Sequence, residues 1–90
     1  SPSRYIPAAV RRQVWERDGG RCTFVDAEGN RCPERRFLEF EHRVPLAKGG
    51  ASTAENIRLL CRAHNQAAAR REFGSRFIER RIAAAREGNE

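Results

Sequence analysis

The sequence contains few of the residues that build a disulfide-rich or membrane-embedded protein. Its 90 residues include three cysteines, and an odd number argues against a complete set of internal disulfide bonds. The mean hydropathy of −0.79 and the lack of a long apolar run argue against a membrane-spanning helix. No secretory signal pattern is visible, so we expect a cytoplasmic, reducing environment, in which clustered cysteines bind metal more often than each other.

The chain is also too short to rely on its core alone. A domain of 90 residues buries only about 60–65% of the surface of its unfolded chain, and domains of this size often add a metal site or disulfides. We expect a single domain over residues 1–90, with a linker and helix over 1–20, a core over about 21–73 and a helix over 75–90. The linker-like segment from Ser1 to Tyr5 predicts that this domain belongs to a longer protein.

Positive charge is distributed unevenly along the chain, whose net charge is +6. Basic residues outnumber acidic residues over residues 1–21 and again over 62–87, whereas residues 22–61 are balanced. Two basic ends around a neutral middle are typical of a protein that holds a polyanion at a central site. The charge pattern therefore favours nucleic acid as the partner, although arginine-rich helices can also serve solubility alone.

Helix and strand signals alternate along the chain. Ile6, Val10 and Val14 recur at four-residue steps, which predicts an amphipathic helix. In chain order, the expected elements are a helix from Pro7 to the stop at Gly19-Gly20, strands over 21–25, 38–44 and 57–60, a helix from about Cys61 to Gly74, and a helix from Ser75 with Ile78 and Ile82 as its apolar stripe. This order predicts a small α+β domain.

Four potential zinc ligands are present: Cys22, Cys32, Cys61 and His64. Cys61 and His64 are separated by two residues, the spacing of a tight zinc knuckle. Three thiolates and one imidazole fit a closed, tetrahedral, structural zinc site. The alternative is three buried thiols and a surface histidine. Zinc binding would contribute about 10 kcal/mol to folding, which is enough to decide whether so small a core folds.

Between the two halves of this ligand set lies an acid–base pair, Glu41-His42, followed by Pro45 and Gly49-Gly50. A neutral imidazole can take a proton from water near physiological pH, and a neighbouring carboxylate can hold a hard divalent ion. An isolated Glu-His pair is more often an ordinary strand edge. The proline and the glycine turn that follow it favour a hydrolytic site instead.

Two asparagines complete the candidate site. Asn56 stands where the glycine loop rejoins a strand, and its amide can hydrogen-bond to backbone on both sides and hold the loop. Asn65 follows His64 on the expected helix, where adjacent residues point about 100° apart. One helix start can therefore turn His64 toward zinc and Asn65 toward a second ion. Either asparagine taken alone is more often a cap or turn residue.

The order of these residues resembles the HNH nucleases, the ββα-metal class. The likeness rests on Glu41-His-Arg-Val-Pro-Leu-Ala-Lys-Gly-Gly50 followed by Glu55-Asn-Ile-Arg-Leu-Leu-Cys-Arg-Ala-His-Asn65, and it spans about residues 21–73. It is specific because an acid-His pair, a proline, two glycines, an asparagine, a cysteine knuckle and a closing polar residue arrive in that order. The resemblance implies a small ββα-metal (HNH) domain with a zinc-stapled hairpin and flanking N- and C-terminal helices.

The resemblance also implies a role for each site residue. His42 would be the general base, Asn56 would orient the loop, and Glu41 and Asn65 would bind the catalytic divalent ion, Mg²⁺ or Mn²⁺. Two positions depart from the usual pattern of the family, because Glu41 stands in place of an aspartate and Asn65 in place of the closing histidine. An alternative alignment makes His64 the catalytic ligand, but zinc would then keep only three protein ligands.

We therefore predict an HNH endonuclease that hydrolyses phosphodiester bonds, with double-stranded DNA as the expected partner. The arginines nearest to the site in sequence, one of which would assist catalysis, are Arg43, Arg58 and Arg62. Two alternatives stay open on the sequence. One is a catalytically inactive, zinc-stabilised module that binds nucleic acid, and the other is a zinc-stabilised protein-interaction domain that docks through its C-terminal helix.

Overall fold

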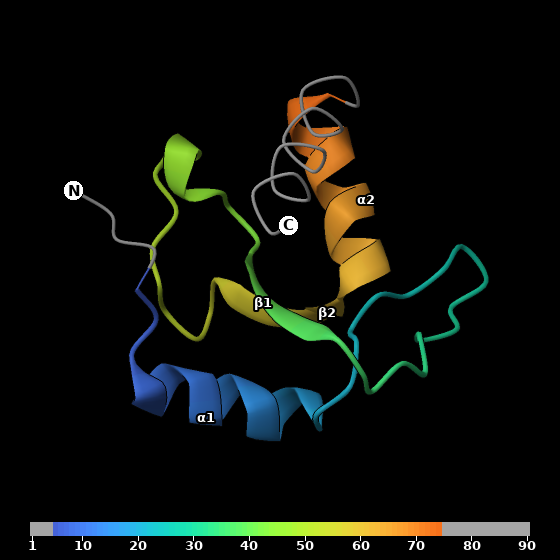
Figure 1. Cartoon of the computed structure of the whole chain (residues 1–90), viewed down its shortest axis with the longest axis horizontal. Coiled ribbons are helices and arrows are strands. Elements are labelled where there is room, and N and C mark those ends of the chain that lie inside the picture. Colours follow the sequence, from blue (N-terminus) through green and yellow to red (C-terminus); the bar gives the residue numbers. More distant parts are fainter. Residues whose placement is uncertain (1–4, 75–90) are drawn as a thin grey trace, which may run out of the picture.

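A two-stranded sheet lies between two helices in the computed structural model of the chain (Figure 1), which describes residues 5–74. The elements, in chain order, are helix α1 (Ala8–Asp18), strand β1 (Leu38–His42), the short 3-10 helix η1 (Leu46–Lys48), strand β2 (Ile57–Cys61) and helix α2 (Arg62–Phe73). β2 leads directly into α2, whereas a long connection joins α1 to β1. This architecture confirms the predicted α+β class.

The two strands are antiparallel and pair along their whole length. Because side chains alternate along a strand, Phe40 and Leu59 lie on the face that packs against α1, and Glu39 and Leu60 lie on the face that packs against α2. The sheet therefore has one apolar face and one face that carries carboxylates. Any polar chemistry on the strands must lie on the α2 side or at the strand ends.

The described part of the core consists of two small clusters. In the first, Val14 of α1 packs against Ile57 and Leu59 of β2. In the second, Leu60 packs against Cys22 and Cys61, two of the predicted metal ligands. Leu38 is partly buried against both clusters and joins them. A core in which thiols take the place of larger apolar side chains gains little from burial, so a metal site suits this fold.

A buried acid at the end of α1 holds this helix against β2. The Asp18 carboxylate accepts the Leu59 N–H at 3.0 Å and pairs with Arg17 at 2.8 Å. Arg17 also donates to the carbonyl oxygens of Ala54 and Ile57, both at 2.6 Å. Burial opposes ionisation of Asp18, but the hydrogen bonds from Arg17 and Leu59 outweigh it and lower the pKa of the carboxyl.

The predicted helices over 7–20 and 61–74 and two of the three strands are confirmed, with differences at their ends. Pro7 is the N-cap of α1 rather than a residue of its first turn, and Gly19 ends this helix with a φ of 72°. β1 stops at His42, two residues before the predicted end, and β2 continues through Cys61. The predicted helix from Ser75 lies outside the described residues. None of the described helices is long and apolar enough to cross a membrane.

The predicted strand over residues 21–25 is wrong. The segment is a loop in which Val25 alone pairs, through a single bridge to Arg31. Its backbone donors go to different partners, since the Cys22 N–H donates to the Glu34 carbonyl and the Thr23 N–H donates to the Leu59 carbonyl of β2. A strand needs a continuous row of hydrogen bonds to a neighbouring strand, and this segment has none. The alternation of its residues could not show that its donors are divided between two parts of the chain.

The loop between β1 and β2 closes tightly around Gly50, which is buried. Its N–H donates to the Pro45 carbonyl at 3.0 Å. A Cβ built on Gly50 would lie 1.7 Å from the Val44 carbonyl oxygen, a distance that no side chain can occupy. Gly49 differs, because its φ of 89° is left-handed but a Cβ there would meet nothing within 4 Å. The two glycines are therefore required for different reasons.

Gly50→Ala should lower the free energy of unfolding by about 3 kcal/mol, because the backbone of the loop must move to admit the methyl group. The matched control, Gly49→Ala, should cost only about 1 kcal/mol, the strain of a left-handed backbone. Urea denaturation of both variants in saturating zinc measures the difference. Equal losses in the two variants would contradict the close approach at Gly50.

Candidate metal centre and active site

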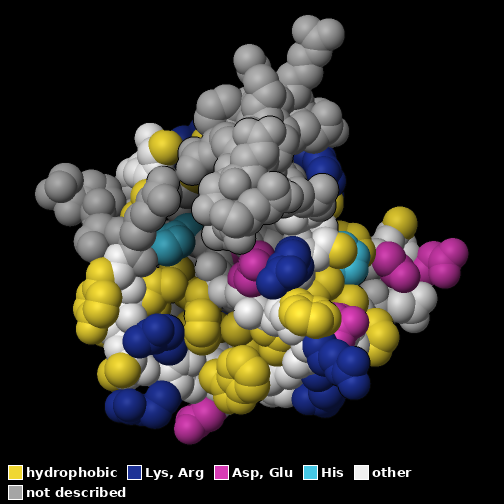
Figure 2. Space-filling view, in the orientation of Figure 1, with side chains coloured by type: hydrophobic (Ala, Val, Ile, Leu, Met, Phe, Trp, Pro, Cys, Tyr) yellow, Lys and Arg dark blue, Asp and Glu magenta, His cyan; other side chains and the backbone are white. Residues whose placement is uncertain are grey.

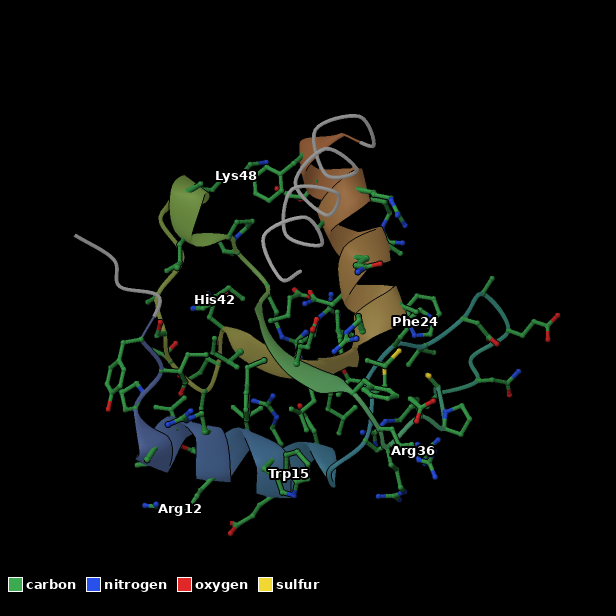
Figure 3. All side chains as sticks on the ribbon, viewed as in Figure 1. Arg12, Trp15, Phe24, Arg36, His42 and Lys48 are labelled. Atoms are coloured by element: carbon green, nitrogen blue, oxygen red, sulfur yellow. The ribbon has the colours of Figure 1, made fainter. Side chains whose placement is uncertain are left out.

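The candidate residues form two groups at opposite ends of the sheet. In Figure 3, Phe24 lies beside the start of α2, whereas His42 lies at the far end of β1. The register agrees, since Leu38 pairs with Cys61 and His42 pairs with Ile57. A strand of this length places its ends roughly 13 Å apart. A residue on the first turn of α2 can therefore contact the β1 face between the two groups.

The structure brings all four predicted zinc ligands together. The three Sγ atoms and the ligand nitrogen of His64 all lie within 4.8 Å of one another. His64 Nδ1 is 3.6 Å from Cys22 Sγ and 3.2 Å from Cys61 Sγ. Around a tetrahedral zinc, sulfur and nitrogen ligands are separated by about 3.6 Å. The Cys₃His cluster therefore fits zinc in both donor chemistry and spacing.

The surroundings of the cluster suit a closed structural site. Cys22 and Cys61 are buried, and the Phe24 ring stacks on the His64 ring with centroids 3.9 Å apart. Burial opposes ionisation of Cys22, but hydrogen bonds from the backbone of Cys61 and Phe24 lower its pKa, whereas burial raises the pKa of Cys61. A bound zinc ion would favour the thiolate at each cysteine.

Two arginines hold the loop that carries Cys22 and Cys32. Arg31 Nε donates to the Cys22 carbonyl at 2.9 Å, and Arg21 Nε donates to the Cys32 carbonyl at 2.9 Å. Arg31 also donates to the Asp18 carbonyl at the end of α1. These guanidinium groups replace the continuous strand ladder that the loop lacks. They thereby help to position two of the four ligands.

The α2 face of β1 carries two carboxylates, and an amide from α2 contacts one of them. Glu39 and Glu41 are two residues apart and thus share this face. Asn65, on the first turn of α2, donates from Nδ2 to Glu39 Oε1 at 2.7 Å. The direct contact of the Asn65 amide is therefore Glu39, while Glu41, the predicted ligand, lies two residues further along the same strand face and pairs with Arg58. Oxygen atoms of this kind suit Mg²⁺ or Mn²⁺.

Both carboxylates are paired with arginine. Arg58 of β2 lies opposite Glu41, and its Nη2 is 3.1 Å from Glu41 Oε2. Arg62, the first residue of α2, approaches Glu39 Oε2 more loosely, at 3.7 Å. Arg43 follows His42 and is exposed. Of the three arginines that the sequence could not separate, Arg58 has the closest contact with a predicted metal ligand.

His42 is the last residue of β1 and is half-buried. Its Nε2 lies 2.9 Å from Ser52 Oγ in the following loop. Burial lowers the pKa of His42 below its ordinary value of 6.5, and the neighbouring Glu41 carboxylate opposes this shift. The imidazole is therefore largely neutral at pH 7. His42 forms the last pair of the ladder, with Ile57, at the end of β1.

Asn56 makes three side-chain hydrogen bonds to the backbone of the loop that follows His42. Its Oδ1 accepts the Val44 N–H at 2.9 Å, and its Nδ2 donates to the carbonyls of Val44 at 3.1 Å and Ala51 at 2.8 Å. The Asn56 carbonyl also accepts the Arg43 N–H at 2.7 Å. One half-buried residue thus fixes both sides of the loop that follows His42.

Sequence reasoning missed Glu39 and Ser52. The signal for Glu39 was available, because a residue two positions before Glu41 shares its strand face. No local pattern indicated Ser52, which contacts His42 across ten positions of the chain. The loop that contains Ser52 is also held to the end of α2 by an ion pair between Lys48 and Glu72.

The comparison with known families agrees with this geometry. A family model described as HNH endonuclease matches residues 21–71, which include both the Cys₃His cluster and the carboxylate face. No curated protein matches the chain significantly in sequence.

Proposed function

Because the chain belongs to the HNH endonuclease family, we propose that it is a metal-dependent endonuclease that cleaves phosphodiester bonds of double-stranded DNA. Membership of the family supports nuclease activity and a nucleic-acid substrate in general. One observation carries the finer proposal. Asn65 of α2 reaches the β1 face that bears Glu41, one residue before the neutral His42 at the strand end.

His42 is the general base in this proposal. The Nε2 atom faces Ser52, so a tautomer with Nε2–H donating to the Ser52 hydroxyl leaves Nδ1 as the acceptor. Nδ1 would take the proton from the water that attacks the scissile phosphorus. The lowered pKa keeps this nitrogen available at neutral pH. Ser52 is then a positioning residue for the base, and Asn56 holds the loop that carries it.

Glu41 and Asn65 are the proposed ligands of the catalytic ion. A divalent ion bound there would neutralise the phosphate and stabilise the leaving oxygen. Glu41 can bind through the oxygen that does not face Arg58, because a carboxylate has two acceptor oxygens. Arg58 is then placed beside the phosphate that approaches Glu41, where its guanidinium can bind a phosphate oxygen. The Cys₃His cluster is the proposed structural zinc site, which fixes the helix start that carries Asn65.

Glu39 is the proposed positioning residue for Asn65. An amide can present either its NH₂ group or its oxygen to an ion, and only the oxygen is a ligand. Because Nδ2 donates to Glu39, the Oδ1 atom is the one left for the ion. Glu39 therefore selects the amide orientation that Mg²⁺ or Mn²⁺ requires.

Glu39→Leu should raise the Mg²⁺ concentration needed for half-maximal cleavage by about tenfold or more, the usual effect of removing an outer-shell partner of a metal ligand. Glu39→Gln should largely restore the wild-type response, since its carbonyl oxygen can still accept from Asn65. Magnesium titrations of cleavage by the three proteins measure this effect. A wild-type response of the leucine variant would remove Glu39 from the proposal.

A cleavage assay tests the proposed function against its alternatives. Supercoiled plasmid is incubated with the protein and Mg²⁺ or Mn²⁺, with EDTA and His42→Ala as controls. Cleavage that needs the divalent ion and His42 supports the nuclease. A gel shift without cleavage by the wild type would support an inactive nucleic-acid-binding module. If the wild type neither cleaves nor shifts the DNA, the protein-interaction domain is the remaining alternative. Parallel reactions with single-stranded DNA and RNA test the choice of duplex DNA.

A further inference from the structure

Phe37, directly before β1, has a backbone conformation that its side chain does not favour. Its φ is 54°, and it is the one non-glycine residue with a positive φ in the described part of the chain. Bulky residues rarely adopt this left-handed conformation, in which glycine and asparagine are more favourable. A persistent outlier of this kind marks a position where another requirement outweighs backbone preference.

The backbone of Phe37 joins two elements of the fold, whereas its ring lies outside the core. The Phe37 carbonyl accepts the Arg62 N–H at 3.0 Å and so links the start of β1 to the start of α2. The side chain is 66% exposed and belongs to neither core cluster. Asparagine or glycine would make the same backbone contact with less strain. Packing therefore does not explain why a phenyl ring stands at this position.

The ring lies at the edge of the proposed catalytic face. The Arg62 guanidinium carbon is 5.2 Å from the centroid of the Phe37 ring. Arg62 in turn approaches Glu39, the contact of Asn65, at 3.7 Å. A short series of contacts thus connects the exposed ring to the residues that would hold the ion. Phe37 precedes Glu41 by four residues, about 13 Å of extended chain. A substrate strand bound at Glu41 and Asn65 and running along β1 would bring a nearby nucleotide to this edge.

The charge around the ring suits a polyanion. Arg35 and Arg36 precede Phe37 and are exposed, and Figure 3 shows Arg36 on the segment before β1. Figure 2 shows basic side chains gathered over this segment, at the lower right of the face, with hydrophobic side chains beside them. Flat aromatic rings beside arginines are the usual means by which proteins bind unstacked bases together with their phosphates.

We propose that the Phe37 ring is a stacking surface for a nucleobase near the phosphate that is cleaved. The inference rests on the proposed nuclease function and deepens it, because it assigns base contact to a residue outside the metal site. Arg35, Arg36 and Arg62 would contact the flanking phosphates, while the ring contacts the face of one base. Stacking tolerates any base, so this contact favours distorted or unpaired positions rather than a particular sequence.

Replacement of Phe37 tests the proposal in a His42→Ala background, which allows binding without cleavage. The probes are a DNA duplex with one unpaired 2-aminopurine and the fully paired duplex. Phe37→Asn should weaken binding to the unpaired probe by about fivefold to 100-fold and abolish the fluorescence change of the base, whereas Phe37→Trp should preserve both. The melting temperature of Phe37→Asn should equal or exceed that of the parent, since asparagine accepts the left-handed backbone.

Val25→Asn is the matched control, because Val25 is an exposed apolar residue on the zinc loop, away from the carboxylate face. It should bind both probes like the parent. Equal binding by Phe37→Asn and the parent, or a tryptophan variant no better than the asparagine variant, would overturn the stacking role and leave the nuclease proposal standing. If the parent binds neither probe and the wild type cleaves no DNA, the proposed function itself fails.

Discussion

Cys61→Ala should leave a largely unfolded chain with no stoichiometric zinc. Cys61 is buried at the junction of β2 and α2, and its Sγ is 3.2 Å from His64 Nδ1. Structural zinc contributes about 10 kcal/mol to folding, while a small domain is stable by only about 5–15 kcal/mol. Loss of one of four ligands therefore removes a large part of the stability of a chain whose described core is two small clusters.

Circular dichroism, thermal melting and metal analysis of the purified protein measure this effect. The matched control is Ala63→Ser, an exposed position between the two ligands of the knuckle, which should keep both zinc and fold. Wild-type protein should contain one tightly bound zinc per chain. A zinc-free wild type whose melting curve does not change on addition of zinc would show that the cluster is not a structural metal site.

The same measurement decides the role of His64. The geometry groups His64 with the three cysteines, so His64→Ala should lose zinc and stability. His64→Cys should retain both, because a Cys-x-x-Cys knuckle also binds zinc. A His64→Ala protein that stays folded and zinc-loaded but inactive would instead make His64 the ligand of the catalytic ion, and Asn65 would lose that role.

His42→Ala should reduce cleavage by roughly 10²–10⁴-fold, the usual contribution of a general base. The fold, zinc content and DNA affinity should persist, because the imidazole is half-buried at a strand end and is not one of the four residues of the Cys₃His cluster. Plasmid cleavage under single-turnover conditions measures the loss. A variant that cleaves within a few-fold of the wild type would exclude His42 as the base.

The pH profile of the wild type provides an independent test of the same residue. Only neutral imidazole accepts a proton, so cleavage should rise with pH through the pKa of His42 and then level off. Burial lowers this pKa, so the midpoint should lie below 6.5, and activity should persist at slightly acidic pH. Ser52→Ala should move this midpoint and lower the rate modestly, because the hydroxyl that faces Nε2 is lost.

Local patterns in the sequence were sufficient for several parts of the protein. The apolar spacing of Ile6, Val10 and Val14 and the glycines after Asp18 predicted α1 closely, because helix periodicity and capping act over a few residues. The zinc ligands were recognisable because an odd number of cysteines in a short chain argues against internal disulfides. Metal binding then becomes the favoured role for three cysteines and a histidine at knuckle spacing. The loop-holding role predicted for Asn56 followed from its position beside a glycine turn, and its side chain makes three hydrogen bonds to the loop backbone.

The remaining features depend on contacts between distant parts of the chain. The segment over 21–25 alternates like a strand, yet its backbone donors are divided between two partners that only the tertiary structure supplies. The pairings of Arg58 with Glu41 and of Asn65 with Glu39 depend on the register of β1 against β2 and on the placement of α2. Periodicity along one strand indicates which residues share a face, but it cannot specify which side chain from another element lies opposite.

The sequence by itself therefore determined the residue types of the candidate site, their order along the chain, and the positions of the two described helices. Only the tertiary structure decided the contacts of each group: Ser52 beside His42, Glu39 on the amide of Asn65, and a strained Phe37 at the edge of the carboxylate face. The physical reason is the range of the forces involved. Backbone propensity and capping act over a few residues, whereas burial, register and side-chain hydrogen bonds join distant residues, which lie 10 positions apart for His42 and Ser52 and 41 for Asp18 and Leu59.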